Sequence, residues 1–386
     1  MLTRRKVDVF LRKFEKEFVT HNLIEVSRLA ILHNLDLFAR LSEKQIMPVL
    51  KGNAYGHGIE QVVTALKSRS FPYIAVDGYF EALRVRAMSQ QPVLIMGAIL
   101  PENFMRMKYD NFSFVVQDTV AIHAIGKTHK HIKVHLECNT GMNRYGAQPE
   151  EVASLAKLIL SYKNLELEGV MSHLADSDGD DPVTIDRATE QFDNCVDVVR
   201  AAGAKPTLLH VGQSAGSLRA QSKYANAIRL GIGLYGINPF SPQYAQHKKL
   251  QRELRPALKL TSTITRIINL KKGDKVSYGY TFTAPKSMKI GVLPLGYYEG
   301  VNRPALSNRG VVKIGKHFTP IVGRVCMNHT MISLEGIMAN VGDQVVVYSD
   351  NPKDENAIDA IAARFDLFNY NLLTALSPDV RRKLVD

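Results

Sequence analysis

The segment VLKGNAYGHG, from Val49 to Gly58, carries the side chains with the clearest capacity for chemistry in this chain. An apolar run, Ile46 to Leu50, precedes Lys51 and is typical of a buried strand. A cation at the end of such a strand is costly unless it is solvated, paired or chemically used. A lysine amine in these surroundings can form an imine with a carbonyl compound. The alternative is a lysine that extends past the strand end into solvent.

The elements that would position this lysine are short apolar runs that alternate with helical stretches. Glu150 to Tyr162 has the clearest helical periodicity. Near-continuous apolar strands are typical of a parallel sheet that is buried on both faces. The alternation predicts an α/β fold, an eight-stranded TIM-type (β/α)8 barrel. Its strands are expected to begin at residues 46, 73, 92, 112, 132, 167, 208 and 227.

After about Pro256 the segments become short, rich in Val, Ile and Thr, and separated by Gly and Asp turns. This pattern of short β-prone segments and turns predicts a C-terminal antiparallel β domain. We therefore expect a barrel over residues 30–248 and the β domain over residues 249–386. Residues 1–29 are expected to form a helix plus a strand, Leu23 to Arg28, that can pack outside the barrel.

Chemistry in such a barrel takes place at the carboxyl-terminal ends of the strands. Lys51, Glu137 and His173 are expected there, and phosphate sites usually follow strands seven and eight. The loops at those two places are GQSAG, with Ser214, and LGIGLYG, which follows Arg229. Backbone N–H groups and a hydroxyl suit a dianionic phosphate, although each loop taken alone could be an ordinary tight turn.

The lysine segment resembles the pyridoxal-phosphate lysine signature of alanine racemases. The resemblance continues in the family's order over nearly the whole chain. It runs through VHLECNTGMNRYG, GVMSHLADSD, HVGQSAG, AIRLGIGLYGINP, VSYGYTF, LPLGYYEGVNR and IVGRVCMNHTMISL. The barrel followed by a β domain is also the architecture that this resemblance implies.

The resemblance implies that Lys51 carries pyridoxal 5'-phosphate. Arg229 matches the arginine that faces the pyridine nitrogen, and His173 the histidine that supports it. An arginine keeps its proton at neutral pH, so it leaves that nitrogen unprotonated and weakens the electron sink. A weak sink favours proton exchange over transamination. The positions that hold the phosphate match Tyr55, Ser214, Gly231, Ile232 and Tyr370.

Racemisation removes a proton from one face of Cα and delivers another to the opposite face, which requires two acid–base groups. By resemblance these are Lys51 and Tyr297. Arg144 and Met327 match substrate-binding positions. The family is a head-to-tail dimer in which this tyrosine reaches the partner's barrel, so we expect a homodimer with shared active sites.

Two positions depart from the family's usual pattern. Glu137 stands where many alanine racemases have a lysine that becomes carbamylated, and we expect its carboxylate to pair with Arg144. Asn328 stands where the family usually has aspartate, which removes a negative charge near the substrate. Both departures bear on substrate preference and leave the cofactor residues intact.

The bulk composition limits the possible partners. The net charge of +12 is scattered, without zinc spacing or an RNP-type motif, so we expect no nucleic acid. The apolar runs are too short to span a membrane. The start, MLTRRKVDVF, suggests an amphipathic helix rather than a signal peptide. The three cysteines, Cys138, Cys195 and Cys326, show no metal or disulfide spacing, which fits a cytoplasmic protein without a metal.

The leading hypothesis is an alanine racemase that supplies D-alanine for peptidoglycan. A racemase of broader or different specificity, for serine or lysine, is the first alternative. A non-catalytic pyridoxal-phosphate carrier is the second, and Tyr297 argues against it. A fold-related decarboxylase is the third, but such enzymes usually have a carboxylate where this chain has Arg229.

Overall fold

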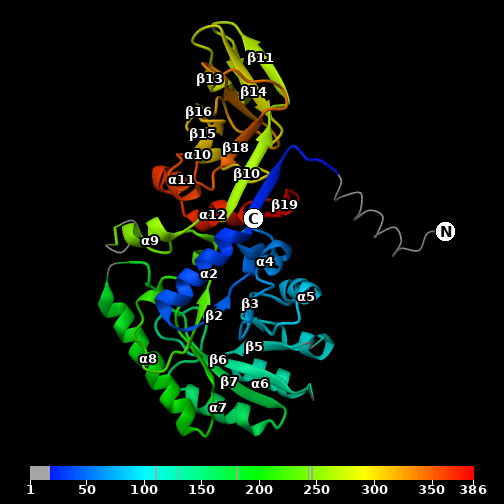
Figure 1. The fold of residues 1–386 in the computed structure, drawn as a ribbon. Helices are drawn as coiled ribbons and strands as arrows, with labels where there is room; N and C mark the ends of the chain where they lie inside the picture. The colour runs from blue at the N-terminus through cyan, green and yellow to red at the C-terminus, as the bar shows by residue number, and fades with distance from the viewer. Residues whose placement is uncertain (1–17, 109–110, 129, 180, 242, 245–246) are drawn as a thin grey trace, which may run out of the picture. The chain divides into compact units, whose positions relative to one another are not determined.

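The computed structural model describes residues 18–108, 111–128, 130–179, 181–241, 243–244 and 247–386 (Figure 1). The chain forms two compact units. Unit 1 consists of the described residues up to Glu25, Lys259–Ser349 and Leu376–Lys383. Unit 2 consists of Val26–Leu258, Asp350–Ala375 and Leu384–Asp386.

Unit 2 is built around eight parallel strands among its described residues, β2 to β9. Strands β3 to β8 form one sheet in chain order, and β2 pairs with β9. The strands are β2 (Gln45–Pro48), β3 (Ile74–Val76), β4 (Val93–Ile95), β5 (Phe112–Val116), β6 (Ile132–Glu137), β7 (Leu165–Met171), β8 (Leu208–His210) and β9 (Ala227–Leu230).

The two sheets of unit 2 close into a barrel through backbone contacts on both sides. Val49 bridges Ala75 in parallel, which joins the end of β2 to β3. On the other side, the N–H of Asn226 donates to Leu209 over 2.9 Å, and that of Arg229 donates to Gly212 over 3.0 Å. The prediction of an eight-stranded TIM-type barrel is confirmed.

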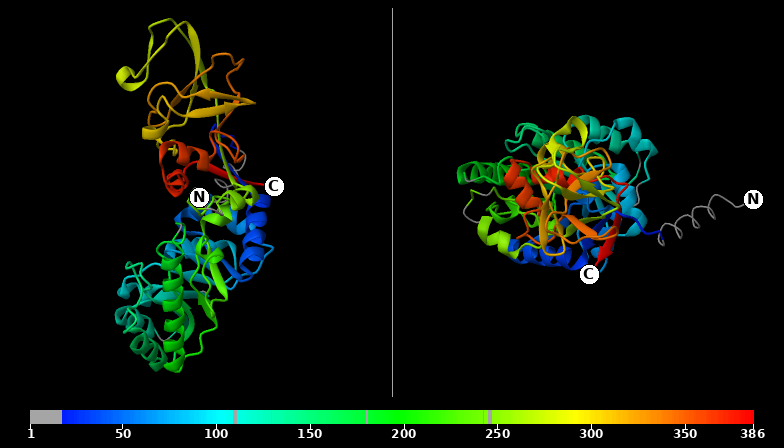
Figure 2. Two further views of the ribbon diagram at one scale, coloured as in Figure 1. Left: turned by 90° about the vertical axis from the view of Figure 1, so that its left-hand side faces the viewer. Right: turned by 90° about the horizontal axis from the view of Figure 1, so that it is seen from above.

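The long helices of unit 2, among them α2 (Arg28–Ser42) and α8 (Pro182–Ala201), lie around the outside of its strands (Figures 1 and 2). The predicted helix Glu150 to Tyr162 is confirmed as α7. The α-helices are α2 (Arg28–Ser42), α3 (Lys51–Tyr55), α4 (Ile59–Ala65), α5 (Tyr79–Met88), α6 (Thr119–Gly126), α7 (Val152–Ser161), α8 (Pro182–Ala201), α9 (His247–Glu253), α11 (Ile358–Phe365) and α12 (Asn369–Thr374). Short 3-10 helices are η1 (Pro101–Arg106), η2 (Gly216–Leu218) and η3 (Ile232–Tyr235).

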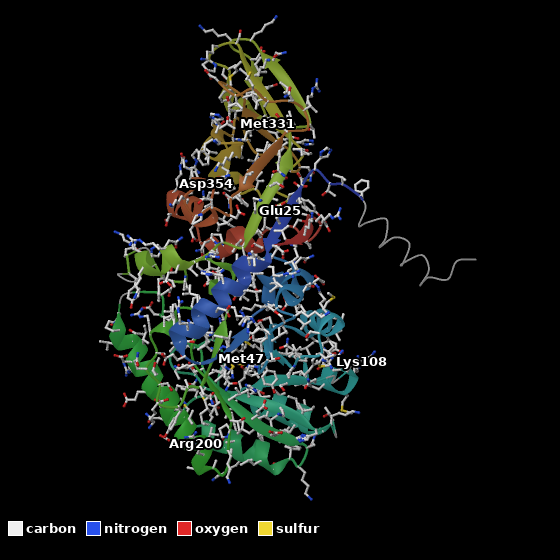
Figure 3. The ribbon with its side chains drawn as sticks, viewed as in Figure 1. Glu25, Met47, Lys108, Arg200, Met331 and Asp354 are labelled. Atoms are coloured by element: carbon white, nitrogen blue, oxygen red, sulfur yellow. The ribbon has the colours of Figure 1, made fainter. Side chains whose placement is uncertain are left out.

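The barrel strands bury apolar residues on both faces, as their largely apolar sequences require. All three residues of β3 and all three of β4 are buried. Polar residues at buried strand positions are therefore exceptions that need partners. One of them is Arg229, which lies opposite Met47 in the register of β9 and β2; Met47 is labelled in Figure 3.

Unit 1 is mostly β structure, and the predicted antiparallel C-terminal domain is confirmed. Its largest sheet has the strand order β16-β15-β18-β10-β1-β19, and β11, β14 and β17 form a second, antiparallel sheet. The strands are β1 (Leu23–Ser27), β10 (Leu258–Thr263), β11 (Arg266–Leu270), β12 (Lys275–Val276), β13 (Phe282–Thr283), β14 (Met288–Leu293), β15 (Val311–Ile314), β16 (His317–Pro320), β17 (Thr330–Ser333), β18 (Gln344–Tyr348) and β19 (Arg381–Val385), with the short helices η4 (Tyr278–Tyr280) and α10 (Arg303–Leu306).

The chain passes between the two units more than once. Helices α11 and α12, from the C-terminal part of the chain, belong to unit 2. The predicted boundary between residues 248 and 249 stays a prediction. The helix expected at the start of the chain lies outside the described residues. Within the described residues, no helix has the length and apolar character to cross a membrane.

Candidate active site

Lys51 begins an unusual turn at the carboxyl end of β2. The four residues that follow it, Gly52, Asn53, Ala54 and Tyr55, all have left-handed backbone angles, with φ of 63°, 54°, 54° and 50°. Each non-glycine residue in this conformation costs about 1–2 kcal/mol. Such strain persists where the surroundings enforce it, and it is concentrated at functional sites.

Two side chains hold this left-handed turn. The Glu81 carboxylate accepts hydrogen bonds from the N–H groups of Gly52, at 2.7 Å, and of Asn53. The Asn53 side-chain oxygen accepts from the N–H of Ile59 and from Arg84, at 2.8 Å. Lys51 itself is half-buried and, within the described part of the chain, its amine has no hydrogen bond or ion pair. The turn therefore presents a lysine amine that has no partner among the residues described.

A cradle of small donors lies at the ends of strands β8 and β9. The hydroxyl oxygen of Ser214 accepts hydrogen bonds from the backbone N–H groups of Gly231, at 3.2 Å, and Gly233, at 3.1 Å. A Cβ at Gly231 would lie 2.7 Å from the Tyr55 hydroxyl oxygen. A glycine at position 231 therefore leaves room for the Tyr55 hydroxyl where it lies. The next residue, Ile232, begins η3.

Two tyrosine hydroxyls add donors to this region. The rings of Tyr55 and Tyr370 lie 5.9 Å apart between centroids. Burial, followed by the charges of Asp77 and Glu81, raises the pKa of Tyr55, and burial also raises the pKa of Tyr370. Both phenols therefore keep their protons at neutral pH. Neither hydroxyl has a hydrogen-bond partner among the residues that the structure describes.

Arg229 on β9 is 2% exposed, and its guanidinium is held by strand ends. It donates to the backbone oxygens of His210, at 2.7 Å, and Ser172, at 2.6 Å. It also contacts the ring nitrogen Nδ1 of His210, at 2.8 Å, and that of His173, at 3.5 Å. Burial lowers the pKa of Arg229 to about 10, so it stays charged at neutral pH. His210, which the sequence reasoning did not single out, is the nearer of the two histidines.

The remaining barrel candidates form a cationic region with one carboxylate. Burial and the charges of Arg229, Arg144 and Lys51 lower the pKa of His173 to about 3, so this ring is neutral. Burial raises the pKa of Glu137, against the opposing charges of Arg229 and Arg144. The charge of Arg144 thus acts on Glu137 at a distance, but within the described residues no ion pair joins the two side chains, so their predicted pairing stays a prediction.

Tyr297 and Met327 belong to unit 1, where the backbone joins their loops. The N–H of Tyr297 donates to Cys326 over 3.0 Å, and that of Tyr298 to Met327 over 3.0 Å. A Cβ at Gly296 would lie 2.2 Å from the Cys326 oxygen, so glycine is needed for this close approach. Tyr297 is 40% exposed, Met327 is 55% exposed, and the guanidinium of Arg303 lies 5.7 Å from the Tyr297 ring centre.

Asn328 has a carboxylate beside it. Its side-chain amide donates to Glu299 over 2.7 Å, and the other oxygen of Glu299 accepts the N–H of Gly296. Residue 328 itself has no negative charge, but the Glu299 carboxylate supplies one beside it.

The structure thus gathers the predicted residues in two groups. Unit 2 holds Lys51, Tyr55, Arg144, His173, Ser214, Arg229, Gly231, Ile232 and Tyr370, and unit 1 holds Tyr297 and Met327. Glu81, which supports the lysine turn, was missed, because an acidic residue in the first turn of a helix is common. Within the described residues, no cluster of His, Cys, Asp and Glu could hold a metal ion.

Comparison with known proteins finds matches to both parts of the chain. The profile of the alanine racemase N-terminal domain matches residues 26–239, and that of the C-terminal domain matches residues 257–384. The alanine racemase of Francisella philomiragia is 31% identical over 371 residues, covering 94% of this chain and all of the relative. That of Methanococcus maripaludis is 30% identical and covers 93% of this chain and 97% of the relative.

Solved structures agree with these matches. The alanine racemase from Bacillus anthracis, with bound L-Ala-P, has a TM-score of 0.86 at 28% identity, covering 96% of each chain. An alanine racemase from Clostridium difficile has a TM-score of 0.88 at 27% identity, covering 96% of this chain and 97% of that one. This chain belongs to the alanine racemase family.

Proposed function

We propose that this protein is an alanine racemase that interconverts L- and D-alanine with pyridoxal 5'-phosphate, using Lys51 and Tyr297 as its two acid–base groups. The observation that supports the proposal is the left-handed turn after Lys51, whose amine has no partner among the described residues and whose last residue, Tyr55, has its hydroxyl next to Gly231 of the Ser214–Gly231 cradle. Family membership over both units supports it.

The residues of unit 2 fit the cofactor. Two tyrosine hydroxyls that have no partner among the described residues match the acceptor oxygens of a phosphate. So does the Ser214 hydroxyl, whose oxygen accepts from two glycine N–H groups and whose proton can donate. Tyr55, Ser214, Gly231, Ile232 and Tyr370 would hold the phosphate, and Arg229 would face the ring nitrogen. The cofactor supplies an electron sink that makes the Cα proton of an amino acid removable.

Two groups would then handle the proton at Cα. The Lys51 amine would act on one face, and the Tyr297 hydroxyl on the other. Arg229 stays charged, so it would keep the ring nitrogen without a proton, and His173, which is neutral, cannot supply one. This electrostatic setting favours return of the proton to Cα over other outcomes.

The substrate carboxylate is expected to meet Arg144 and the backbone of Met327. Glu137 would orient Arg144 through its own carboxylate, in place of the carbamate that the family often uses. The burial of Glu137 near two arginines supports this role, because a buried carboxylate requires nearby positive charge.

We propose a homodimer in which Tyr297 of one copy serves the barrel of the other. The exposure of Tyr297 and Met327 on adjoining loops supports this assignment, because exposed apolar side chains grouped together mark interaction sites. Mixing Lys51→Ala protein with Tyr297→Phe protein, after dissociation and reassociation, tests it. Shared sites predict that activity returns in the mixture, whereas sites within one copy predict that it does not.

A second candidate is a racemase of broader specificity, for serine or lysine. The environment of residue 328 favours keeping it, since an amide paired with Glu299 replaces the family's usual aspartate. Incubation with a panel of L-amino acids, followed by chiral measurement of the D-enantiomers, tests both candidates. Alanine should turn over fastest, and a faster rate with serine or lysine would establish the second candidate. Failure to form any D-amino acid would contradict both.

The cellular role that follows is supply of D-alanine for peptidoglycan in the cytoplasm. The three cysteines are free thiols, which supports a reducing compartment. Rescue of a D-alanine-requiring bacterium by the gene would test this role.

A further inference from the structure

A chain of buried polar side chains leads away from Arg229 through the barrel. The guanidinium lies 2.8 Å from Nδ1 of His210, whose Nε2 lies 2.8 Å from Nδ1 of His135. The Nε2 of His135 lies 3.3 Å from an oxygen of Glu168. Both histidines are fully buried and Glu168 is 9% exposed. The four residues come from β9, β8, β6 and β7, so four strands each contribute one link.

The chemistry at the two ends of this chain fixes the direction of every hydrogen bond. A guanidinium only donates, so Nδ1 of His210 must accept and carry no proton. A neutral imidazole then has its proton on Nε2, which donates to Nδ1 of His135. The same reasoning places the His135 proton on Nε2, where it donates to Glu168. An ionised carboxylate only accepts, so both ends require the same pair of tautomers.

The surroundings keep the members of the chain in these states. Burial lowers the pKa of both histidines, so each ring is neutral. Burial alone would raise the pKa of Glu168, but hydrogen bonds from His135, Lys133 and Tyr73 outweigh it and lower the pKa to about 2. The amine of Lys133 lies 2.5 Å from the other carboxylate oxygen, and the Tyr73 hydroxyl donates to the oxygen that faces His135.

We propose that Glu168 is a positioning residue for Arg229: its carboxylate fixes the tautomers of His135 and His210, so that His210 presents a lone pair to the guanidinium. Glu168 touches neither cofactor nor substrate and acts only through the two rings. The inference rests on the proposed function solely in the task assigned to Arg229, since the tautomers themselves are properties of the protein alone.

Lys133 gives a variant at Glu168 a definite expected orientation, because its amine can only donate hydrogen bonds. In Glu168→Gln, the amide oxygen is expected to face Lys133, which turns the amide NH2 toward His135. The His135 proton would then move to Nδ1, and a donor on His210 would face Arg229. In the double variant Lys133→Met with Glu168→Gln, the amide oxygen is free to face His135 again. Lys133→Met alone removes a half-exposed charge and leaves the chain intact.

The test is 15N NMR of the full-length protein with labelled histidine rings, with and without added pyridoxal phosphate. Loss of signals in His135→Gln and His210→Gln assigns the two rings. In the wild type, we expect Nδ1 to be unprotonated and Nε2 to be protonated on the rings of both His135 and His210. A protonated Nδ1 on either ring would overturn the proposal, even if the protein proves to be an active racemase.

The variants complete the test. Glu168→Gln should shift the His135 proton to Nδ1, Lys133→Met should leave the wild-type pattern, and the double variant should restore it. A Glu168→Gln spectrum with both rings unchanged would also overturn the proposal. Thermal melting of each variant verifies that the protein is folded, and failure of D-alanine formation in the wild type would count against the proposed function only.

Discussion

The two groups of candidate residues differ in how the protein holds them. In unit 2 the residues support one another: the lysine turn is held by Glu81, Ser214 is held by glycine N–H groups, and Arg229 is held by strand ends. In unit 1, Tyr297 and Met327 are exposed, and only the backbone joins their loops. In the function proposed above, the first group would hold the cofactor, and the second would serve the barrel of a second copy.

Substitution of the lysine should have the largest effect on this comparison, because it removes the central amine of the organised group. Lys51→Ala is expected to lower the rate of alanine racemisation by at least ~10³-fold. The visible absorbance that added pyridoxal phosphate gives with the wild-type protein should also be lost. Chiral chromatography and an absorbance spectrum measure the two effects. A variant that keeps the absorbance would show that another amine holds the cofactor.

Substitution of the exposed tyrosine should separate the two groups. Tyr297→Phe removes only a hydroxyl, so we expect racemisation to fall by about 10²–10⁴-fold while the cofactor absorbance stays unchanged. Tyr298→Phe is the matched control, because the neighbouring hydroxyl donates to Asp379 instead. Equal racemisation by the two variants would show that the Tyr297 hydroxyl is not one of the two acid–base groups.

A smaller effect is expected when the cradle itself is narrowed. Gly231→Ala puts a methyl group against the Tyr55 hydroxyl and should displace it. Loss of one hydrogen bond, about 0.5–1.5 kcal/mol, should weaken cofactor affinity by up to ~10-fold. Fluorescence titration with pyridoxal phosphate measures this. Gly78→Ala is the control, because a Cβ there meets nothing within 4 Å. Similar losses of cofactor affinity in both variants would refute the proposal that Tyr55 and the Ser214–Gly231 cradle hold the phosphate.

The smallest expected effect concerns the buried carboxylate near Arg144. Glu137→Gln should raise KM for alanine by about 2- to 5-fold, because it removes a negative charge that acts on the arginine without a direct ion pair. Since the folded pKa of Glu137 is raised, its contribution to stability is present below about pH 4 and is lost as pH rises through the folded pKa. The variant should therefore melt at a higher temperature than wild type at neutral pH, with a difference that shrinks in acid. A lower melting temperature at neutral pH would contradict this.

Much of the fold could be predicted from the sequence, because it follows from local patterns. Most of the eight barrel strands are largely apolar runs, and α7 has clear periodicity. The return of α11 and α12 to unit 2 was not predicted. Their sequences indicate helices, but the unit on which a helix packs depends on long-range contacts that no local pattern records.

The site was predictable in part, and the missed features are informative. Ala54 and Tyr55 disfavour left-handed angles, so no local preference predicts their turn. Hydrogen bonds from Gly52 and Asn53 to Glu81, which is far away in the sequence, help to hold it. Tyr370 was assigned from the family resemblance and not from its own surroundings in the sequence. A signal for the buried chain did exist, since Glu168, His135 and His210 are polar residues inside apolar strands.

The central claim is that Lys51 and Tyr297 act on opposite faces of the same carbon. Its most direct test is the incubation of Tyr297→Phe holoenzyme with each enantiomer of alanine in D2O. The account predicts that Cα of one enantiomer exchanges its hydrogen for deuterium without inversion, because Lys51 still serves its own face, while the other enantiomer stays unlabelled. Equal exchange of both enantiomers, or inversion at the wild-type rate, would contradict it.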